Sequence, residues 1–303
     1  MAPASKVNFP ANFQVEEGVD LFIYGDYLYW RAAEEGLHLV NKGSATLGTV
    51  QKIDPDFDSG FRVGFGLNFP RAGYDLGGYW TSFTTRATNS TQSTSWPLWA
   101  EPNVAASSSE KASWHLSMNL ADLEWGRASW FGGNFSLRPF FSLRGAFIDQ
   151  KLSMNFAYET TPSSLGVIHA KSDFSGGGLR AGADGRWTFP YGFALYGQAA
   201  GSLLYGQFQT KSTWGLDSQT VACAKNNFLQ TLSNMQLALG FGWDTHFYKD
   251  QLHIEFHIGW EQALFFHMNR MSHYINQLSK ALYFQEQGNL SVQGVTVGGR
   301  FDF

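Results

Sequence analysis

The segment around His253 shows the clearest spacing for chemistry, because His253, Glu255 and His257 occupy alternate positions. Imidazole and carboxylate groups are zinc ligands, and residues two apart on an extended strand share one face, ~6–7 Å apart. His253 and His257 would nevertheless lie ~13 Å apart, too far to share one ion without ligands from other strands. We therefore favour a polar network over a metal site, and we predict neither a metal nor a cofactor.

Other candidate catalytic groups are sparse. His267, His273 and Glu286 fall in or near one polar segment, but no serine or aspartate stands at a diagnostic spacing from them. The glycines at 176–178 lie inside a strand pattern with no helix or lysine after them, which does not fit a phosphate-binding loop. We predict that the protein is not an enzyme, and a hydrolase with an outer active site is the less favoured alternative.

Composition narrows the class of protein. Hydrophobic residues make up 44% of the 303 residues and charged residues 15%, yet no run reaches the ~18 apolar residues of a membrane helix. Aromatic residues reach 17% and glycines number 33, which is typical of many strands joined by turns. A net charge of −4 gives no basic surface for nucleic acid. These features favour an all-β protein that does not bind nucleic acid.

Alternation of apolar and polar residues is clearest on both sides of Lys249-Asp250. Before this turn the odd-numbered residues from Met235 to Trp243 are apolar, and after it the even-numbered residues from Leu252 to Trp260 are apolar. A two-residue turn would pair His246 with His253 and Asp244 with Glu255, so the polar faces of both strands coincide. The pattern predicts a hairpin with one apolar and one polar face.

Eight further segments show similar alternation. We expect ten strands at about 19–30, 60–69, 73–85, 113–128, 135–150, 173–189, 192–210, 229–248, 252–261 and 290–303. The strand at 113–128 alternates poorly, because its apolar residues up to Leu120 keep one phase whereas Leu123 and Trp125 keep the other. A β-bulge near residues 120–122 would keep the apolar face continuous.

The connections alternate between short and long. Short links fall at 70–73, 132–133, 190–191 and 249–250, and long polar links at 31–57, 86–112, 157–172, 211–228 and 268–288. Outer-membrane barrels have short periplasmic turns and long extracellular loops, with aromatic girdles at the interfaces. Aromatic residues do cluster beside the short links, as Phe69, Tyr74, Phe131 and Trp187 illustrate. A soluble sandwich would not require this regularity.

We therefore predict a transmembrane antiparallel up-and-down β-barrel of about ten strands. Residues 1–16 would form an N-terminal periplasmic segment and residues 17–303 a single barrel domain in the bacterial outer membrane. The N-terminus shows no apolar signal region, so we expect the signal peptide to have been removed before this numbering begins. The last strand ends on Phe301 and Phe303, a C-terminal barrel signature through which we expect the barrel-assembly machinery to act.

The polar faces of these strands would line the lumen. The predicted lumen-lining residues are Arg138, Arg144, Arg180, Asp184, Arg186, Asp244, His246, His253, Glu255, His257, Glu261 and Arg300. The arginines would form one sector and the carboxylates another, so that opposed charges orient a polar solute. Abundant lumen glycines favour a residual channel, whereas inward folding of the 86–112 loop would favour occlusion. Asp244 beside Glu255 requires a neutralising basic group such as Arg300.

Cys223 is the single cysteine, which excludes an internal disulfide. We expect it to be an unpaired loop residue, and the alternative is a thiol that pairs between molecules of a homo-oligomer. The sequence leaves the oligomeric state open.

Several motifs resemble those of the Legionella-type pore-forming outer-membrane proteins and of the related chlamydial major-outer-membrane-protein-like family, over most of the chain. The motifs are Asp26-Tyr-Leu-Tyr-Trp30, Gly60-Phe-Arg-Val-Gly64, Trp96-Pro-Leu-Trp99, Asp122-Leu-Glu-Trp-Gly-Arg127, Leu137-Arg-Pro-Phe-Phe141 and Gly201-Ser-Leu-Leu-Tyr-Gly206. The resemblance implies an outer-membrane barrel with porin-like activity and no catalytic residues. We expect passive diffusion of small polar solutes or ions, with outer-membrane lipid as the surrounding partner. A structural or adhesive surface barrel with a plugged lumen is the main alternative.

Overall fold

The computed structural model describes residues 7–11, 20–43, 47–69, 73–99, 106–159, 164–217, 219–247, 252–274 and 283–303. Among these residues, no helix has the length and apolar character that a membrane-crossing helix needs. Outside the described residues lie residues 70–72 of the link predicted at 70–73, the whole link predicted at 249–250 and part of the link predicted at 268–288.

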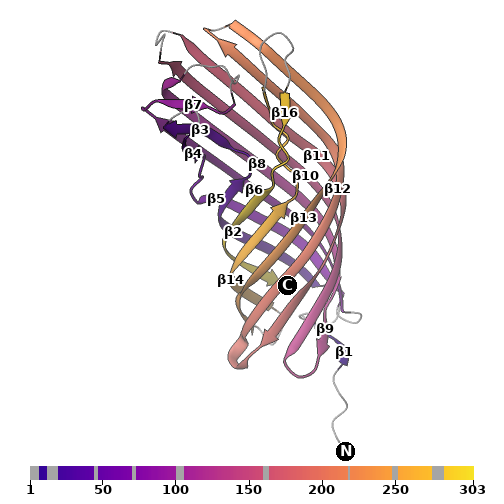
Figure 1. The fold of residues 1–303 in the computed structure, drawn as a ribbon. Helices are drawn as coiled ribbons and strands as arrows, with labels where there is room; N and C mark the ends of the chain where they lie inside the picture. Colours follow the sequence, from indigo (N-terminus) through magenta and orange to yellow (C-terminus); the bar gives the residue numbers. More distant parts are fainter. Residues whose placement is uncertain are drawn as a thin grey trace, which may run out of the picture.

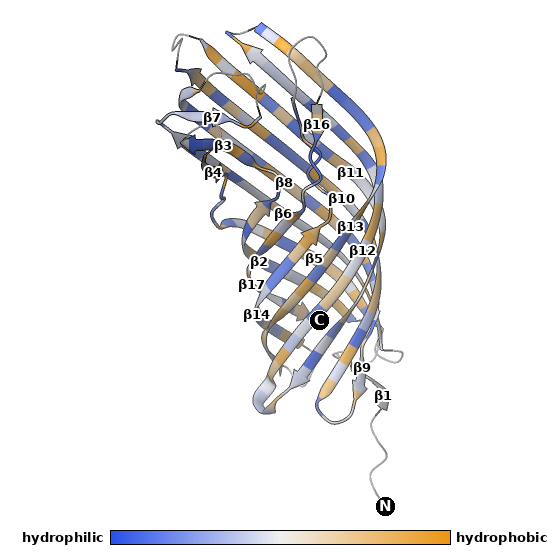
Figure 2. Ribbon diagram, in the orientation of Figure 1, coloured by the Kyte–Doolittle hydropathy of each residue, from blue (hydrophilic) through white to orange (hydrophobic). Residues whose placement is uncertain are grey.

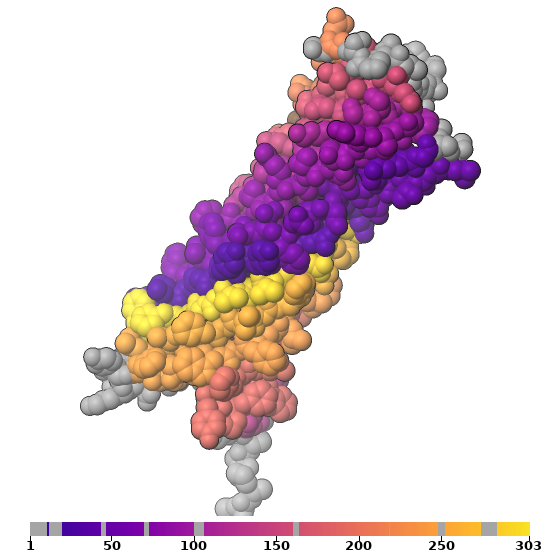
Figure 3. Space-filling view, turned by 90° about the vertical axis from the view of Figure 1, so that its left-hand side faces the viewer, coloured from indigo at the N-terminus to yellow at the C-terminus, as the bar shows by residue number. Residues whose placement is uncertain are grey.

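Ten of the described strands pair side by side in a closed antiparallel ring (Figure 1). They are β2 (Asp20–Glu34), β5 (Asp58–Phe69), β6 (Tyr74–Thr91), β8 (Ser107–Arg127), β10 (Phe135–Tyr158), β11 (Leu165–Thr188), β12 (Phe193–Leu216), β13 (Gln219–Phe247), β14 (Leu252–Phe265) and β17 (Leu290–Asp302). The pairing of β17 with β2 closes the ring, and Figure 3 shows this seam as a yellow strand against an indigo one. The predicted fold class is confirmed.

Strand lengths differ strongly around the ring. Strands β10 to β12 each have 24 residues and β13 has 29, whereas β5, β14 and β17 have 12 to 14. The long strands form a wall that extends well beyond the short ones at the upper end of Figure 1. The links predicted at 157–172 and 211–228 were therefore wrong, because most of these residues continue the strands.

Short elements complete the two ends of the barrel. At the lower end, β1 (Val7–Pro10) pairs with β9 (Ser129–Phe131), and a 3-10 turn (Pro190–Gly192) joins β11 to β12. At the upper end, β3 (His38–Gly43) pairs with β4 (Gly48–Lys52) and with β7 (Ser95–Pro97), and β7 also pairs with β8. The hairpin of β15 (Ser272–Tyr274) and β16 (Tyr283–Gln285) approaches β12, where the Ser212 hydroxyl donates to the Ser272 carbonyl.

The outward face of the lower half is apolar. On β10 the outward residues from Leu137 to Phe147 include Phe141 and Leu143, which are about half exposed. Ten residue steps span ~33 Å of strand, and a tilt of ~40° converts this length into ~25 Å of height. This height matches the apolar band of a membrane barrel. Figure 2 shows the alternation of apolar and polar residues along the strands.

The upper half reverses this arrangement. Beyond Phe147 the outward residues of β10 are polar, whereas the inward residues Ile148, Leu152, Met154 and Phe156 are almost completely buried. They join a hydrophobic core with inward residues from most of the ring and with residues of the upper segments, among them Leu39, Trp99 and Met271. The outside of the wall thus faces lipid in the lower half and water in the upper half. Its apolar residues therefore point outward in the lower half and inward in the upper half.

This reversal explains the poor alternation that we noted at residues 113–128. Strand β8 pairs in unbroken register with β6 and, from Ser109 to Gly126, with β10, so the predicted bulge near 120–122 was wrong. Trp114, Leu116, Met118 and Leu120 point inward into the upper core, while Leu123 and Trp125 point outward. The apolar residues of β8 switch from the inward to the outward face at the level where the outer surroundings change from water to lipid. The backbone of the strand stays regular there.

Candidate functional site

The lower half of the barrel holds a cavity of about 290 Å³. Its lining reaches from Ala11 and Ser136 at the lower end to Met118 and Leu120, which belong to the apolar core. Six arginines and several carboxylates contribute to the lining, which is therefore polar and charged. This cavity is the candidate functional site, because it combines space and charge and extends to the lower end of the barrel.

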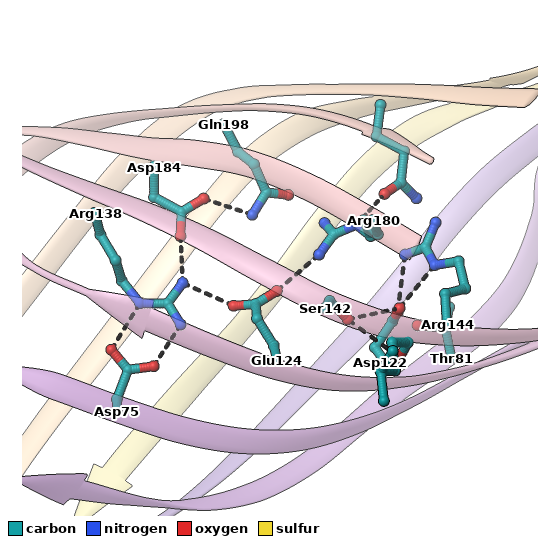
Figure 4. A network of polar contacts seen from close by, with 12 residues as sticks. Asp75, Thr81, Asp122, Glu124, Arg138, Ser142, Arg144, Arg180, Asp184 and Gln198 are labelled. Carbon is teal, nitrogen blue, oxygen red and sulfur yellow. Dashed lines mark hydrogen bonds and ion pairs between the residues drawn. The ribbon is translucent and has the colours of Figure 1, made fainter. Parts of the chain in front are cut away.

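Arg138 organises one side of this cavity (Figure 4). Its guanidinium donates to Asp75 at 2.5 and 2.8 Å and lies 2.7 Å from both Asp184 and Glu124. Glu124 also accepts a bond from Arg180 at 2.7 Å. The group connects strands β6, β8, β10 and β11, so these carboxylates share two arginines.

Two further arginines form ion pairs between strands that are not neighbours in the ring. Arg62 on β5 reaches Asp26 at 3.0 Å and Glu261 on β14 at 2.8 Å. Arg186 on β11 bridges Asp244 and Glu255. These ion pairs run across the lumen between strands that are not adjacent. The low dielectric of a partly buried site makes each of them stronger than the same pair would be in water.

Arg144 lies deeper, at the base of the apolar core. Its guanidinium donates to both oxygens of Asp122 at 2.7 and 2.8 Å and to the Asn234 side chain at 3.0 Å. Arg144 is 4% exposed, so a bidentate carboxylate partner is what makes its burial tolerable.

The predicted pairing of β13 with β14 is confirmed. Asp244 lies opposite Glu255, and His246 lies opposite His253. Arg186 supplies the basic group that these two carboxylates require. Arg300, which we had suggested for this role, lies on β17 directly opposite Glu255.

The two histidines of the metal hypothesis make separate contacts. His253 Nδ1 lies 2.8 Å from Asp302, and His257 Nε2 lies 3.0 Å from Asp26. Within the described residues, no group of three or more histidine, cysteine or acidic side chains has the geometry of a metal site.

Nine of the twelve predicted lumen residues line the cavity, namely Arg138, Arg144, Arg180, Asp184, Arg186, Glu255, His257, Glu261 and Arg300. Asp244 contacts it through Arg186. His253 is fully buried beside Asp302, and His246 is exposed at the lower end with its ring 4.8 Å from that of His253. Residues that the prediction missed include Asp75, Asp122 and Glu124. The supposed bulge hid the last two, whose inward phase is plain once β8 is taken as regular.

The proposed opposition of charge sectors was wrong. Each of the six cavity arginines lies within 4 Å of at least one carboxylate, so positive and negative groups are neutralised locally. These described ion pairs set nine carboxylates against six guanidinium groups, an excess of negative charge.

The lumen glycines were predicted to leave a channel, and they do so only in part. The Tyr196 ring lies over Gly240, where an added Cβ would come within 2.7 Å of it, and Tyr79 covers Gly64 in the same way. These glycines make room for large neighbouring side chains. The space that persists is the polar cavity itself.

Cys223 lies in strand β13 and not in a loop, and it is exposed. Most of the aromatic residues predicted at the lower girdle are exposed, whereas Trp130 and Phe301 are half-buried and Tyr248 lies outside the described residues. The exposed ones include Phe69, Tyr74, Phe131, Trp187, Phe189, Phe247 and Phe303.

The chain is similar in sequence or in fold to several known proteins. A family model described as the Legionella pneumophila major outer membrane protein precursor matches residues 17–303. The outer membrane protease OmpT from Escherichia coli shares 12% identity, with 95% of this chain and 96% of that chain covered and a TM-score of 0.47. The Pseudomonas putida toluene transporter TodX shares 8% identity, with 95% and 90% covered and a TM-score of 0.26. No curated protein matches the chain.

Proposed function

The chain belongs to the family of the Legionella pneumophila major outer membrane protein, and from this premise we propose that it is a gated, porin-like pore for small polar solutes. Its location is the bacterial outer membrane, and its barrel crosses that membrane with ten strands. The observation that carries the proposal is the charged cavity, which occupies the membrane-crossing half of the barrel and is closed by the apolar core above it.

The closed end explains why the pore needs a gate. The apolar core includes Leu37, Leu39, Val40 and Trp99, which belong to the upper segments and not to the ring. Trp99 Nε1 donates to the His38 carbonyl at 2.7 Å, which ties two of these segments together. Apolar constrictions block ions because water leaves them, and segments outside the ring can move without opening the barrel.

One buried carboxyl group makes the core sensitive to pH. Glu110 is 5% exposed, neither of its oxygens has a hydrogen-bond partner among the described residues, and it pairs with Phe156 of the core. Burial raises the pKa of Glu110 from 4.5 to about 8. The folded core favours the protonated form of Glu110, because the pKa is raised in the folded state. The stability of the core is therefore greatest below pH 4.5 and falls as the pH rises to about 8. The gate is therefore weaker near pH 8.5 than near pH 6.

Single-channel recording in planar bilayers tests the proposal. We compare the refolded chain with a variant in which residues 38–52 are replaced by a short glycine-serine linker. We expect rare openings of the unaltered chain near pH 6, more openings near pH 8.5, and larger steps from the variant. The excess of lumen carboxylates predicts a reversal potential that favours cations. Circular dichroism and heat-modifiable migration in gels confirm folding.

A structural or adhesive barrel is the second candidate, and the continuous apolar core across the upper half favours it. Silence from both well-folded samples at both pH values would establish this alternative and reject the pore. We propose no catalytic activity. His273 and Glu286 lie 3.3 Å apart at the upper end, but the adjacent Ser272 is buried and does not stand at a diagnostic spacing for a nucleophile.

A further inference from the structure

A row of basic side chains crosses the outer surface of six neighbouring strands. The register places Arg86 opposite His115, His115 opposite Lys151, and Lys151 opposite Lys171. It continues with Lys211 opposite Lys171 and Lys225 opposite Lys211. We call these six residues, on β6, β8, β10, β11, β12 and β13, the basic row. With ~4.8 Å between strands, the basic row is ~24 Å long.

All six side chains face outward. Arg86, Lys151, Lys211 and Lys225 are exposed, while His115 and Lys171 are half-buried. On the first five strands the residues on either side, such as Ala87, Gln150 and Ser172, are buried inside the barrel. On β13 the pairing of Lys225 with Lys211 places Lys225 on the same outer face. The basic row therefore belongs to the outside wall of the upper half and is separate from the cavity.

The position of the basic row relative to the membrane is fixed by the apolar band. Phe147 is the last outward apolar residue of β10, and Lys151 follows four residues later, ~10 Å higher for a strand tilted by ~40°. Head groups extend the bilayer by several Å beyond each side of its hydrocarbon core. Flexible lysine stems reach down toward them. The basic row thus lies at the level of the outer head groups or just above it.

Like charges directly opposite each other destabilise a sheet. Lys151, Lys171, Lys211 and Lys225 are opposed on four successive strands, and only Lys171 has a carboxylate partner, Asp173, within the part of the chain that the structure describes. Asp149 lies opposite Asp173 one step closer to the membrane, which offsets part of the charge. Several cations remain without a counter-charge from the protein, and an external anion would remove their repulsion.

We propose that the basic row binds the phosphate groups of an anionic glycolipid in the outer leaflet of the membrane. Ammonium and guanidinium groups bind phosphate through charge-assisted hydrogen bonds. The row is long enough to contact more than one phosphate group, and the lipid acyl chains would continue down the apolar band beneath it. The site is independent of the cavity and of its gating.

Binding of bisphosphorylated lipid A to the full refolded chain in zwitterionic micelles tests the proposal. The test variant combines Lys151→Gln, Lys211→Gln and Lys225→Gln. The control combines Lys42→Gln, Lys52→Gln and Arg127→Gln, which removes the same charge from β3, β4 and the lower end of β8. Each lysine near a membrane surface contributes about 1 kcal/mol to anionic-lipid binding, so we expect the test variant to bind about 100-fold more weakly and the control to bind as the unaltered chain does.

Two further measurements separate the sources of phosphate and the role of repulsion. Lipid A stripped of its phosphates should bind as weakly as the test variant binds the intact lipid, and equimolar inorganic phosphate should not compete. Without lipid, the test variant should melt at a higher temperature than the unaltered chain, because repulsion is relieved. Equal lipid binding by the test variant and the unaltered chain, equal losses in both variants, or full competition by inorganic phosphate would each overturn the proposal.

Discussion

Arginine is the residue that holds the lower lumen together. Its planar group donates several hydrogen bonds in fixed directions, so one side chain can serve carboxylates from several strands. Arg138 does so for Asp75, Glu124 and Asp184. By contrast, Arg31 pairs with Asp54, whose side chain is 76% exposed. One protein thus contains both a largely buried arginine network and an exposed arginine ion pair.

Replacing Arg138 tests the strength of the buried network. Arg138→Gln leaves three carboxylates close together without their common partner, and breaking a buried ion pair costs about 3–5 kcal/mol. We expect a loss of that size in the free energy of unfolding by urea in lipid vesicles. The matched control is Arg31→Gln, for which we expect less than about 1 kcal/mol. Equal losses in the two variants would show that the Arg138 network adds nothing beyond a surface ion pair.

Single strands carry the reversal between the two halves of the barrel. On β10, Leu143 faces outward in the lower half and Asn155 faces outward in the upper half, and both are exposed. The same side of one strand therefore contacts two different surroundings. A strand of 24 residues spans ~80 Å, far more than the ~33 Å that the apolar band requires.

Arginine substitutions along β10 measure where the membrane ends. A charged residue on the lipid face near the bilayer midplane costs about 2–4 kcal/mol, so Leu143→Arg should lower the free energy of unfolding in vesicles by this amount. Asn155→Arg should change it by less than about 0.5 kcal/mol, because surface substitutions in water are nearly neutral. A similar cost at both positions would place Asn155 inside the membrane and contradict the reversal.

The whole molecule is asymmetric along its axis. The charged cavity reaches the lower end, where Ser136 is part of its lining. The upper half is closed, and Ser172 there is completely buried with an unpaired hydroxyl among the described residues. A small solute should therefore enter from the periplasmic side and stop below the apolar core.

Cysteine labelling tests this asymmetry. In a Cys223→Ser background, Ser136→Cys and Ser172→Cys are equally conservative changes. We expect a charged thiol reagent to label residue 136 on the order of 100-fold faster than residue 172, which reacts only when the core opens locally. Comparable rates near pH 6 would show that the upper half is permeable to water in its resting state.

The sequence by itself determined the class of fold, because alternation with a period of two is a local property. Alternation and turn length alone predicted that His246 lies opposite His253 and that Asp244 lies opposite Glu255. The strand count and the position of aromatic residues at the lower end followed in the same way, whereas the family resemblance rested on sequence motifs. Nine of the twelve residues predicted for the lumen line the cavity for this reason.

Only the tertiary structure decided how far the strands extend and what fills the lumen. Residues such as Lys211 and Thr213 are polar outside and Trp214 is apolar inside, a pattern that resembles a loop when lipid is expected outside. Partners such as Arg138 and Asp75, or Arg62 and Glu261, come from distant strands, and tilt and closure of the ring bring them together. The face of a strand on which a residue lies is encoded by the local sequence. Contacts across the lumen depend on how the strands close into a ring.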